Sequence, residues 1–464
     1  MNVLLVEPPK KTWELMGDCV SPPLGLAQLA AVLEEDDIGV EILDCNAEGI
    51  SWSQLCGVID ERRPDVIGAT TLTPFFDQAV RVMEIAKEVD RGIVTILGGP
   101  HVTFTPEETL LQHSDIDLIV RGEGERTLIE LIRCLETGDN LAQVNGIALR
   151  QDGEILLTPP QPPVDVTTLP LPAYHLLHME RYHFTIFGKF ATLLSSRGCP
   201  FQCTFCSEWR FWGGSWRPRE PKSVVDEMEL LHKEHGRECF WFGDDCFNVS
   251  AEHMRGICDE IIDRGLDISW YYQGRADFII KHKELLPLMR RAGNLMTQVG
   301  VETSTNRELE EFNKKLSRVQ VEEAVALLKK NDIVAQGLLL VGTRDDDARS
   351  IHHKIRYMKW LDPDFPIFTM CTPFPGSDIY EQARANGWLE SLDYSLYDMS
   401  HAVMPTEHIS RNQLTSLYNW CFISYYTDPI KLAKGLLSRN SWKRKVWRHM
   451  LGYTAKQFLG SLRW

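Results

Sequence analysis

Three cysteines stand close together in the segment RGCPFQCTFCSEW. Cys199, Cys203 and Cys206 are spaced C-x3-C-x2-C, and no fourth cysteine follows at a short interval. A structural zinc site needs a fourth ligand, and the downstream pair His232 and His235 falls in a predicted helix at a spacing that matches no common zinc finger. Three thiolates suit a four-iron cluster better, because they hold three irons and leave the fourth open to a chelating substrate.

The same segment carries a family resemblance. C-x3-C-x-Phe-C, with Phe205 as the aromatic residue, resembles the cluster motif of the radical S-adenosylmethionine superfamily, and the similarity extends over residues 190–400. It implies a 4Fe-4S cluster whose open iron binds the amino group and carboxylate of S-adenosylmethionine. The implied fold is a partial (β/α)6 barrel over residues 186–400, with its reactive face at the carboxyl ends of the strands.

Charged residues follow three strands of this expected barrel. The segment FWFGDDCF places Asp244 and Asp245 where the resemblance implies a hydrogen bond from the substrate ammonium; the alternative is a carboxylate pair that caps the next helix. Arg275 could meet the substrate carboxylate, or it forms an ordinary ion pair near Asp277. Glu302 could accept hydrogen bonds from ribose hydroxyls, or it marks the start of a helix.

The other barrel elements are predicted from hydrophobic pattern. A strand is expected at residues 191–195, and helices are expected at residues 222–235, 251–265, 283–293 and 320–332. LLLVGTRDDD and CTPFPGSDIY resemble the fifth and sixth strands with their loops. The turn Gly342-Thr343-Arg344 departs from the family's usual glycine–proline turn, which leaves the adenine contacts open.

Residues 1–150 alternate between apolar strands and amphipathic helices. This alternation predicts a parallel sheet covered on both faces, in a flavodoxin-like, doubly wound α/β domain whose ligand lies at the carboxyl ends of the strands. Glycines at those ends let the backbone approach a flat ligand, or they serve only tight turns. No G-x-G-x-x-G follows the first strand, so a dinucleotide is not favoured. The candidate residues after three of the strands are Thr70, Thr71, Leu72 and Thr73; Gly98, Gly99 and His101; and Gly122, Glu123 and Gly124.

In chain order, PPLGLAQLAAVLEE, VEILD, IGATTLT, LGGPHVTFTPEETL and VRGEGERTL resemble the cobalamin-binding domain found in front of many radical S-adenosylmethionine enzymes. The resemblance implies cobalamin at these strand ends, with residues 70–75 near its lower face. Other cobalamin proteins supply an axial histidine from Asp-x-His-x-x-Gly. Asn46 replaces that histidine in the similar stretch 44–49, so we expect cobalamin without a histidine ligand. His101 could touch the edge of the cofactor or make a structural hydrogen bond.

Two further regions complete the predicted organisation. Proline-rich residues 151–185 predict a linker between the domains. Residues 401–464 form a basic, aromatic C-terminal region, in which ten Lys and Arg after residue 410 face one acid, Asp428. Helices are predicted at residues 412–426 and 442–459. The region is interpreted as a docking surface for an acidic substrate or partner, a membrane-surface helix, or a helical cap on the acidic body.

Composition limits the function classes. The formal net charge of −16 argues against nucleic acid as a partner. No stretch of about 18 apolar residues is present, and the N-terminus lacks the pattern of a signal peptide. A cytoplasmic protein is therefore expected. Its twelve cysteines are then thiols, and the nine outside the trio are predicted to be single, mostly buried residues.

Together the resemblances imply a cobalamin-dependent radical S-adenosylmethionine methyltransferase that methylates an unactivated carbon, with a reductant such as flavodoxin or ferredoxin. The first alternative is a non-methylating enzyme that performs oxidative cyclisation or ring rearrangement, as in the anaerobic magnesium-protoporphyrin monomethyl ester cyclase group, which the chain also resembles. The second is a cluster- or zinc-bearing sensor or binding protein. The substrate stays open between a peptide or protein, a tetrapyrrole and another small molecule.

Overall fold

The computed structural model describes residues 1–10 and 18–461, which divide into two compact units. Of the described residues, the first unit holds 1–10, 20–182 and 210–213, and the second holds 18–19, 183–209 and 214–461. None of the helices in these described ranges has the length and apolar character needed to cross a membrane.

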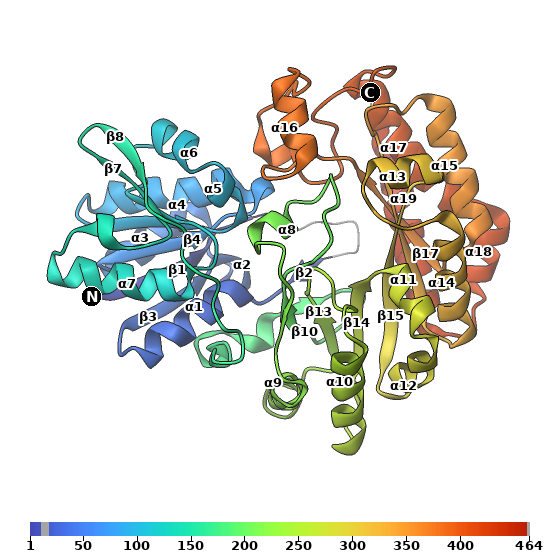
Figure 1. The fold of residues 1–464 in the computed structure, drawn as a ribbon, viewed down its shortest axis with the longest axis horizontal. Coiled ribbons are helices and arrows are strands. Elements are labelled where there is room, and N and C mark those ends of the chain that lie inside the picture. The colour runs from blue at the N-terminus through green and yellow to red at the C-terminus, as the bar shows by residue number, and fades with distance from the viewer. Residues whose placement is uncertain (11–17, 462–464) are drawn as a thin grey trace. The chain divides into compact units, whose positions relative to one another are not determined.

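The first unit is built on a seven-stranded sheet of order β3-β1-β4-β5-β6-β7-β8. The first five strands are parallel in the flavodoxin-like order, and helices α1 and α7 cover one face while α3 and α4 cover the other (Figure 1). Burial on both faces explains why these strands are continuous apolar runs in the sequence. The elements are β1 (Asn2–Glu7), β2 (Cys19–Val20), α1 (Leu24–Glu35), β3 (Gly39–Asp44), α2 (Cys45–Glu48), α3 (Trp52–Arg62), β4 (Val66–Thr70), α4 (Phe76–Val89), β5 (Val94–Gly98), α5 (Pro100–Phe104), α6 (Pro106–Gln112), β6 (Leu118–Val120), α7 (Gly124–Thr137), β7 (Ile147–Gln151) and β8 (Glu154–Leu157).

The hairpin of β7 and β8 was not predicted. The two strands pair with each other and with β6 in antiparallel fashion, and they extend the sheet past residue 150. Asp152 and Gly153 form the turn with φ values of 52° and 85°. An Asp-Gly pair between short strands is a strong hairpin signal, because both positions favour positive φ. The first residues of the proline-rich segment therefore belong to the sheet.

The second unit contains a six-stranded parallel sheet in chain order, β10-β13-β14-β15-β16-β17, as in a (β/α)6 partial barrel. Its strands are β10 (Phe190–Leu193), β13 (Cys239–Phe242), β14 (Ser269–Gly274), β15 (Asn294–Glu302), β16 (Val334–Val341) and β17 (Phe365–Met370). The sixth strand precedes the segment CTPFPGSDIY, which forms the loop after β17 and the start of α16 (Asp378–Ala385). Short strands β9 (His183–Phe184), β11 (Ser196–Arg197) and β12 (Arg217–Pro218) lie outside this sheet.

Helices connect the successive strands of the second sheet. They are α9 (Pro221–His235), α10 (Ala251–Asp263), α11 (Ala276–Lys281), α12 (Leu286–Arg291), α13 (Asn306–Glu311), α14 (Arg318–Lys330) and α15 (Ala348–Leu361), and α8 (Glu208–Phe211) follows the cysteine segment. A Cβ atom on Gly337 would lie 2.9 Å from Met358 of α15, which identifies the face of β16 that points toward the helices. On the same outer side, Trp270 and Tyr272 of β14 pack with Phe247.

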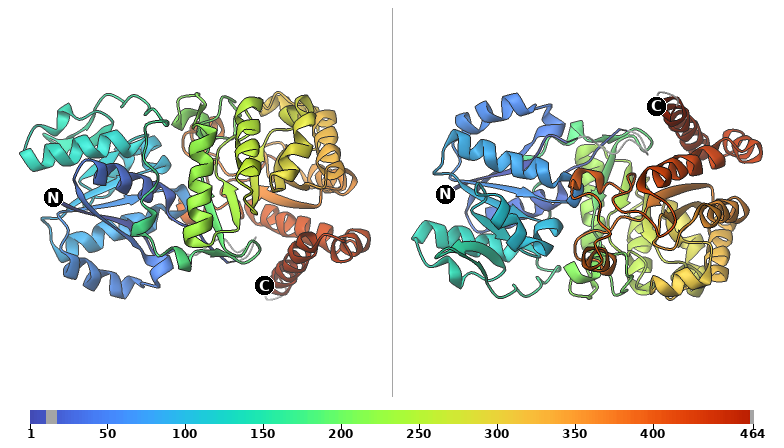
Figure 2. Two further views of the ribbon diagram at one scale, coloured as in Figure 1. Left: turned by 90° about the horizontal axis from the view of Figure 1, so that it is seen from below. Right: turned by 90° about the horizontal axis from the view of Figure 1, so that it is seen from above.

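The C-terminal region forms three helices, α17 (Arg411–Tyr426), α18 (Pro429–Leu436) and α19 (Ser441–Ser461), which gather beside β17 and α15 (Figure 2). Asp362 pairs with Lys431 and Lys434 of α18, and Tyr426 donates a hydrogen bond to the Pro366 carbonyl over 2.6 Å. These contacts pack the C-terminal helices against the rest of the second unit, as expected if the region is a helical cap and not a docking surface or a membrane-surface helix. Residues 462–464 lie outside the described part of the chain.

Candidate functional site

The cysteine segment begins at the carboxyl end of β10 and is anchored by Asp244. The Asp244 carboxylate follows β13 and accepts hydrogen bonds from the Ser195 amide (3.1 Å), the Ser195 hydroxyl (2.9 Å) and the Ser196 hydroxyl (2.5 Å). Burial raises the pKa of Asp244, which is 3% exposed. His253 of α10 also contacts the Ser195 hydroxyl, and burial lowers its pKa to about 4, so this imidazole is neutral. This network fixes the start of the loop that carries the trio.

The three predicted cluster ligands lie within electrostatic reach of one another. Burial raises the pKa of Cys203 and of Cys206, and charge on the neighbouring thiols raises it further. The Cys246 thiol makes a hydrogen bond with Cys199, which lowers the pKa of Cys199 to about 7 against the opposing effect of burial. Cys246 stands singly in the sequence, but the fold brings it from the loop after β13 to the trio.

The donor atoms of this loop are suited to an iron–sulfur cluster held by three thiolates. All three side chains are free thiols in one segment, and the cations Arg275 and Lys314 act to lower the pKa of Cys199 and Cys203. In the described residues, no group of three His, Cys, Asp or Glu side chains is already arranged to hold a metal ion.

Two cations border the cysteine loop. The Arg275 guanidinium lies 3.7 Å from the centre of the Phe201 ring, contacts the Asp277 carboxylate at 3.0 Å and donates to the Lys314 carbonyl over 2.9 Å. The structure thus contains the Asp277 ion pair that was the alternative interpretation of Arg275. Because Phe201 stands between Cys199 and Cys203, Arg275 also supports the loop itself.

Glu302, at the end of β15, pairs with Lys314 over 2.5 Å. Its φ of 59° lies in the left-handed region, which costs energy for a residue with a side chain and is often kept at functional sites. Lys314 also lies 5.6 Å from the centre of the Phe205 ring. Glu302 does not cap α13, because the cap is Thr305. The helix-start interpretation of Glu302 is therefore wrong.

Asp245 lies beside the cysteine loop. Its carboxylate accepts a hydrogen bond from the Gly198 amide over 3.2 Å, and burial together with the nearby Glu208 carboxylate raises its pKa well above the ordinary value. Neither Asp244 nor Asp245 caps α10, whose cap is Ser250. The capping interpretation of this pair is therefore also wrong.

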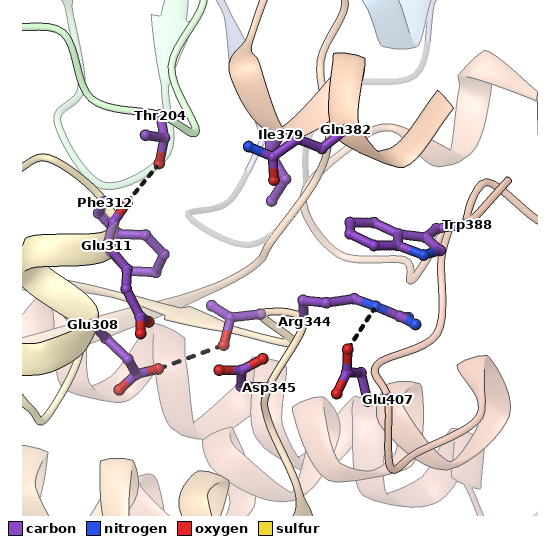
Figure 3. A pocket seen from close by; sticks show the side chains of 11 residues that line it. Thr204, Glu308, Glu311, Phe312, Arg344, Asp345, Ile379, Gln382, Trp388 and Glu407 are labelled. Carbon is purple, nitrogen blue, oxygen red and sulfur yellow. Dashed lines mark hydrogen bonds and ion pairs between the residues drawn. The ribbon is translucent and has the colours of Figure 1, made fainter. Parts of the chain in front are cut away.

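A cavity of about 340 Å³ lies next to the cysteine loop at the carboxyl ends of β15, β16 and β17 (Figure 3). The Arg344 guanidinium lies 4.5 Å from the centre of the Trp388 ring and 3.9 Å from Glu407. Figure 3 shows these three side chains opposite Glu308, Glu311 and Phe312. The lining residues are Thr204, Glu308, Glu311, Phe312, Thr343, Arg344, Asp345, Ile379, Gln382, Trp388 and Glu407.

A buried ion network fixes one wall of this cavity. Lys354 of α15 is 0% exposed and lies 2.8 Å from both Glu308 and Asp346. Asp346 in turn accepts hydrogen bonds from the amides of Gly342 (2.9 Å) and Thr343 (3.1 Å). Carboxylate and backbone contacts thus hold the turn that departs from the family's usual glycine–proline sequence.

In the first unit, the three predicted strand-end segments meet at one edge of the sheet. The Thr71 amide and hydroxyl both donate to the Gly98 carbonyl, over 2.8 Å and 2.7 Å. A Cβ atom on Gly99, whose φ is 98°, would lie 2.7 Å from the Thr71 amide nitrogen, so only glycine fits. The Gly122 amide donates to Thr103 over 2.9 Å, and Leu72 is 50% exposed. Thr70 ends β4, Thr73 is buried, Glu123 occupies the N-cap position of α7, and Gly124 begins that helix against Leu29.

The histidine and asparagine near this edge are engaged in structural contacts. His101 is 1% exposed, contacts the Thr73 hydroxyl at 3.3 Å and packs 4.4 Å from the Phe76 ring. Burial lowers its pKa to about 3, so it is a neutral, structural side chain. Asn46 donates to the Pro8 carbonyl over 2.9 Å and accepts from the Lys10 amide over 2.9 Å, so it too has structural partners.

Several residues at the two sites were not identified from the sequence. Lys314 and Cys246 reach the cysteine loop, Lys354 fixes the wall of the cavity, and Lys10 pairs with Glu7 and lies 4.7 Å from the Phe75 ring. No motif marks these lysines, because each acquires its partner only through tertiary contacts. Burial raises the pKa of Glu7, and Lys10 opposes this effect.

Comparison with known proteins assigns both units to a family. The model for the B12 binding domain matches residues 19–132, and the model for the Radical SAM superfamily matches residues 193–357. An uncharacterized methyltransferase of Pyrococcus horikoshii is 33% identical over 444 residues, which are 95% of this chain and 96% of that protein. The anaerobic magnesium-protoporphyrin IX monomethyl ester cyclase of Rubrivivax gelatinosus is 33% identical over 422 residues, 89% of this chain and 75% of that protein.

A solved structure shows the same fold. The radical S-adenosylmethionine methyltransferase TsrM from Kitasatospora setae, with cobalamin and a [4Fe-4S] cluster bound, gives a TM-score of 0.75 at 19% identity, over 99% of this chain and 100% of that one. The chain belongs to the radical S-adenosylmethionine enzymes that carry a B12-binding domain. It is an enzyme of the group that contains the cobalamin-dependent methyltransferases, and the fold class predicted from the sequence is confirmed.

Proposed function

We propose that this enzyme methylates an unactivated carbon, using a 4Fe-4S cluster, S-adenosylmethionine and cobalamin. The observation that carries the proposal is a three-cysteine loop at the carboxyl ends of a parallel (β/α)6 sheet, in a chain whose first unit matches the B12 binding domain. The Pyrococcus horikoshii relative, which matches over 95% of this chain, is itself described as an uncharacterized methyltransferase.

Cys199, Cys203 and Cys206 are proposed to hold the cluster. When bound, the cluster would supply the electron that cleaves S-adenosylmethionine, and cobalamin would carry the transferred methyl group. The protein supplies a buried loop and nearby cations. Lys314 and Arg275 balance the negative charge of three thiolates, which burial alone disfavours.

The S-adenosylmethionine site is proposed from Phe205, Asp245, Arg275 and Glu302. Asp244 has its carboxylate oxygens engaged by Ser195 and Ser196, so Asp245 is the better acceptor for the substrate ammonium. Glu302 is proposed to accept hydrogen bonds from the ribose hydroxyls. Arg275 is proposed to position the cysteine loop through Phe201 as well as to face the substrate carboxylate.

Cobalamin is proposed to lie on the edge formed by residues 70–73, 98–99 and 122–124. The exposed Leu72 side chain supports an apolar approach to the lower face of the cofactor, and the buried His101 supports binding without a histidine ligand. We also retain as proposals a division near residue 185, a flavodoxin or ferredoxin as the reductant, and a cytoplasmic location. Cysteines such as Cys56, Cys239 and Cys258 are thiols, which fits a reducing compartment.

The test uses anaerobically reconstituted enzyme, methyl-labelled S-adenosylmethionine and fractionated small-molecule and peptide extracts. The proposal expects labelled methyl in a product, together with S-adenosylhomocysteine and 5′-deoxyadenosine. The Cys203→Ala variant should form no 5′-deoxyadenosine. Formation of 5′-deoxyadenosine in the presence of a consumed substrate that never acquires label would refute methyl transfer.

Oxidative cyclisation of a tetrapyrrole is the second candidate function. It is favoured by the cyclase relative, which is as similar in identity as the methyltransferase relative although a smaller share of it is covered. Incubation with magnesium-protoporphyrin IX monomethyl ester distinguishes the two. Cyclisation predicts an unlabelled product with an additional ring, whereas methylation predicts a product that carries the labelled methyl group.

A further inference from the structure

The inner face of the six-stranded sheet carries a row of three amides. Gln273 of β14 is paired in register with Gln298 of β15, which is paired with Gln336 of β16. Partners in register on parallel strands point to the same face, and neighbouring strands lie about 4.8 Å apart. Gly337 faces the helices, so Gln336, its neighbour in the strand, points to the inner face. The row therefore places three carboxamides across about 10 Å of this face.

An aromatic stack adjoins the row. Trp241 of β13 and Tyr271 of β14 are in register, and their rings lie 6.2 Å apart at an interplanar angle of 6°. Phe187 covers Tyr271 at 4.4 Å, and Trp442 of α19 lies 4.4 Å from Phe187. Tyr271 and Gln273 are two residues apart on one strand, so the stack and the amide row share a face.

Polar atoms on this face lack partners. Among the described residues, the Gln336 Oε1, Trp241 Nε1 and Thr192 Oγ1 atoms are buried without a hydrogen-bond partner. Gln336 is 1% exposed, and Thr192 is in register with Trp241. A buried polar atom without a partner destabilises the fold, so proteins keep such atoms where a ligand or water satisfies them. Gln273 is exposed and Gln298 is half-buried, so the row is open at its β14 end and buried at Gln336.

The surrounding chemistry limits what binds. The residues that alternate with the row on the same face are uncharged: Met296, Gly300, Leu338, Leu340, Ile367 and Thr369. Toward the carboxyl ends, the Glu302 carboxylate and the Lys314 ammonium would lie 2.1 Å and 2.9 Å from a Cβ atom on Gly300. Those two charges neutralise each other. A charged group on the ligand would find no partner on this face.

We infer that this face is a substrate subsite for an uncharged, planar ring that bears both an N–H donor and a carbonyl acceptor. The ring lies beside the Nε1 edge of Trp241, its N–H donates to Gln336, and its carbonyl accepts from Trp241 Nε1 or from the carboxamide nitrogens of Gln273 and Gln298. The inference rests on the proposed function in one respect, namely that the carbon to be modified belongs to the molecule bound here. It extends that function by naming the substrate class and its recognising residues.

The experiment measures binding of 2-oxindole to the reconstituted full-length enzyme by calorimetry and by saturation-transfer NMR. Oxindole is planar and uncharged, and it offers one N–H and one carbonyl. With about ten non-hydrogen atoms, such a probe is expected to bind with a Kd on the order of 1 mM. Indane, which has the same bicyclic shape without polar atoms, and the anion indole-3-acetate should each bind at least about tenfold more weakly.

Two variants test the recognising groups separately. Gln336→Leu removes the buried acceptor, and Trp241→Phe keeps an aromatic ring but removes the N–H donor. Each should weaken oxindole by about five- to tenfold, as expected for one neutral hydrogen bond, without weakening indane. Gln151→Leu, at an exposed glutamine of β7 in the first unit, is the matched control and should change neither.

Equal oxindole binding by wild type and both variants would overturn the inference, as would tighter binding of indane or of indole-3-acetate. Oxindole binding too weak to detect at several times the expected Kd would also overturn it, and would mean that water satisfies Gln336. These outcomes leave the proposed function intact if methyl transfer still occurs. If the enzyme binds oxindole selectively but forms no 5′-deoxyadenosine, the proposed function is refuted while the subsite inference stands.

Discussion

Replacing Lys354 by methionine tests the buried network beside the cavity. The substitution keeps a long, helix-compatible side chain but leaves the Glu308 and Asp346 carboxylates, both 2.8 Å from the lost ammonium, without their cation. Removing one partner of a buried ion pair costs about 3–5 kcal/mol, because the remaining charge stays desolvated. Lys354 now holds the pKa of Glu308 below its ordinary value, although burial acts to raise it.

The remaining hydrogen bonds place the cost toward the lower end of this range. Asp346 keeps the amides of Gly342 and Thr343, and Glu308 keeps the Thr305 hydroxyl at 2.9 Å. We therefore expect Lys354→Met to lower the free energy of unfolding by about 3 kcal/mol. Amide hydrogen exchange should increase at residues 342–347, because the loop after β16 loses the group that holds Asp346.

Lys359→Met on the same helix is the matched control. Lys359 pairs with Asp428 over 3.1 Å, but both side chains are partly exposed, at 28% and 23%. An ion pair of that kind is worth about 0–1 kcal/mol. Urea titration followed by circular dichroism, with exchange mass spectrometry, measures both variants. A loss below about 1 kcal/mol for Lys354→Met, or equal losses for the two variants, would refute the reasoning.

Three further predictions address the two candidate sites. Cys203→Ala should remove most of the iron and the cluster absorbance of reconstituted enzyme, because two thiolates cannot hold three irons. Gly99→Ala should destabilise the protein by at least about 2 kcal/mol in denaturant titrations, since φ is 98° and the new Cβ atom would meet backbone at 2.7 Å. His101 has a pKa of about 3 in the fold against an ordinary 6.5, so the unfolded chain takes up the proton first as the pH falls. The free energy of unfolding that depends on neutral His101 is therefore fully present above pH 6.5 and falls as the pH drops below it. His101→Gln should therefore reduce by about 2 kcal/mol the stability lost between about pH 7 and pH 5.

Each of these has its own control. Cys56→Ala, at an exposed helical cysteine, should leave iron content unchanged, and equal iron in both cysteine variants would exclude Cys203 as a ligand. Gly57→Ala, inside α3 with nothing within 4 Å of the new Cβ atom, should stabilise the protein by up to about 1 kcal/mol; the same sign for Gly99→Ala would contradict the crowding argument. An unchanged pH difference in His101→Gln would show that this imidazole is not kept neutral by the fold.

The fold was largely predictable because its signals are local. Five apolar strands alternating with amphipathic helices predict the first sheet, and the C-x3-C-x2-C segment with the following strand–helix units predicts the second. The β7 and β8 hairpin was missed although Asp152-Gly153 signals it, because the proline-rich residues beyond it favoured a linker. The sixth strand was placed a few residues late because Pro366 interrupts its apolar run.

The site was less predictable because it depends on tertiary contacts. The spacing identifies the cysteine trio, but nothing in the sequence shows that Cys246 reaches Cys199 or that Lys314 pairs with Glu302. Asp244 and Asp245 are adjacent in sequence, yet the fold gives them different partners, Ser195 and Ser196 for one and Gly198 for the other. A sequence pattern names the residue types, and only the fold shows which of their atoms are already engaged.

Label transfer from methyl-deuterated S-adenosylmethionine tests the central claim most directly. The reconstituted enzyme, with cluster, cobalamin and a low-potential reductant, is incubated with substrate fractions, and product and nucleoside masses are followed together. Methylation predicts a product that carries the deuterated methyl group, with S-adenosylhomocysteine and 5′-deoxyadenosine formed alongside it. A consumed substrate whose product contains no label, with 5′-deoxyadenosine still formed, would contradict the account.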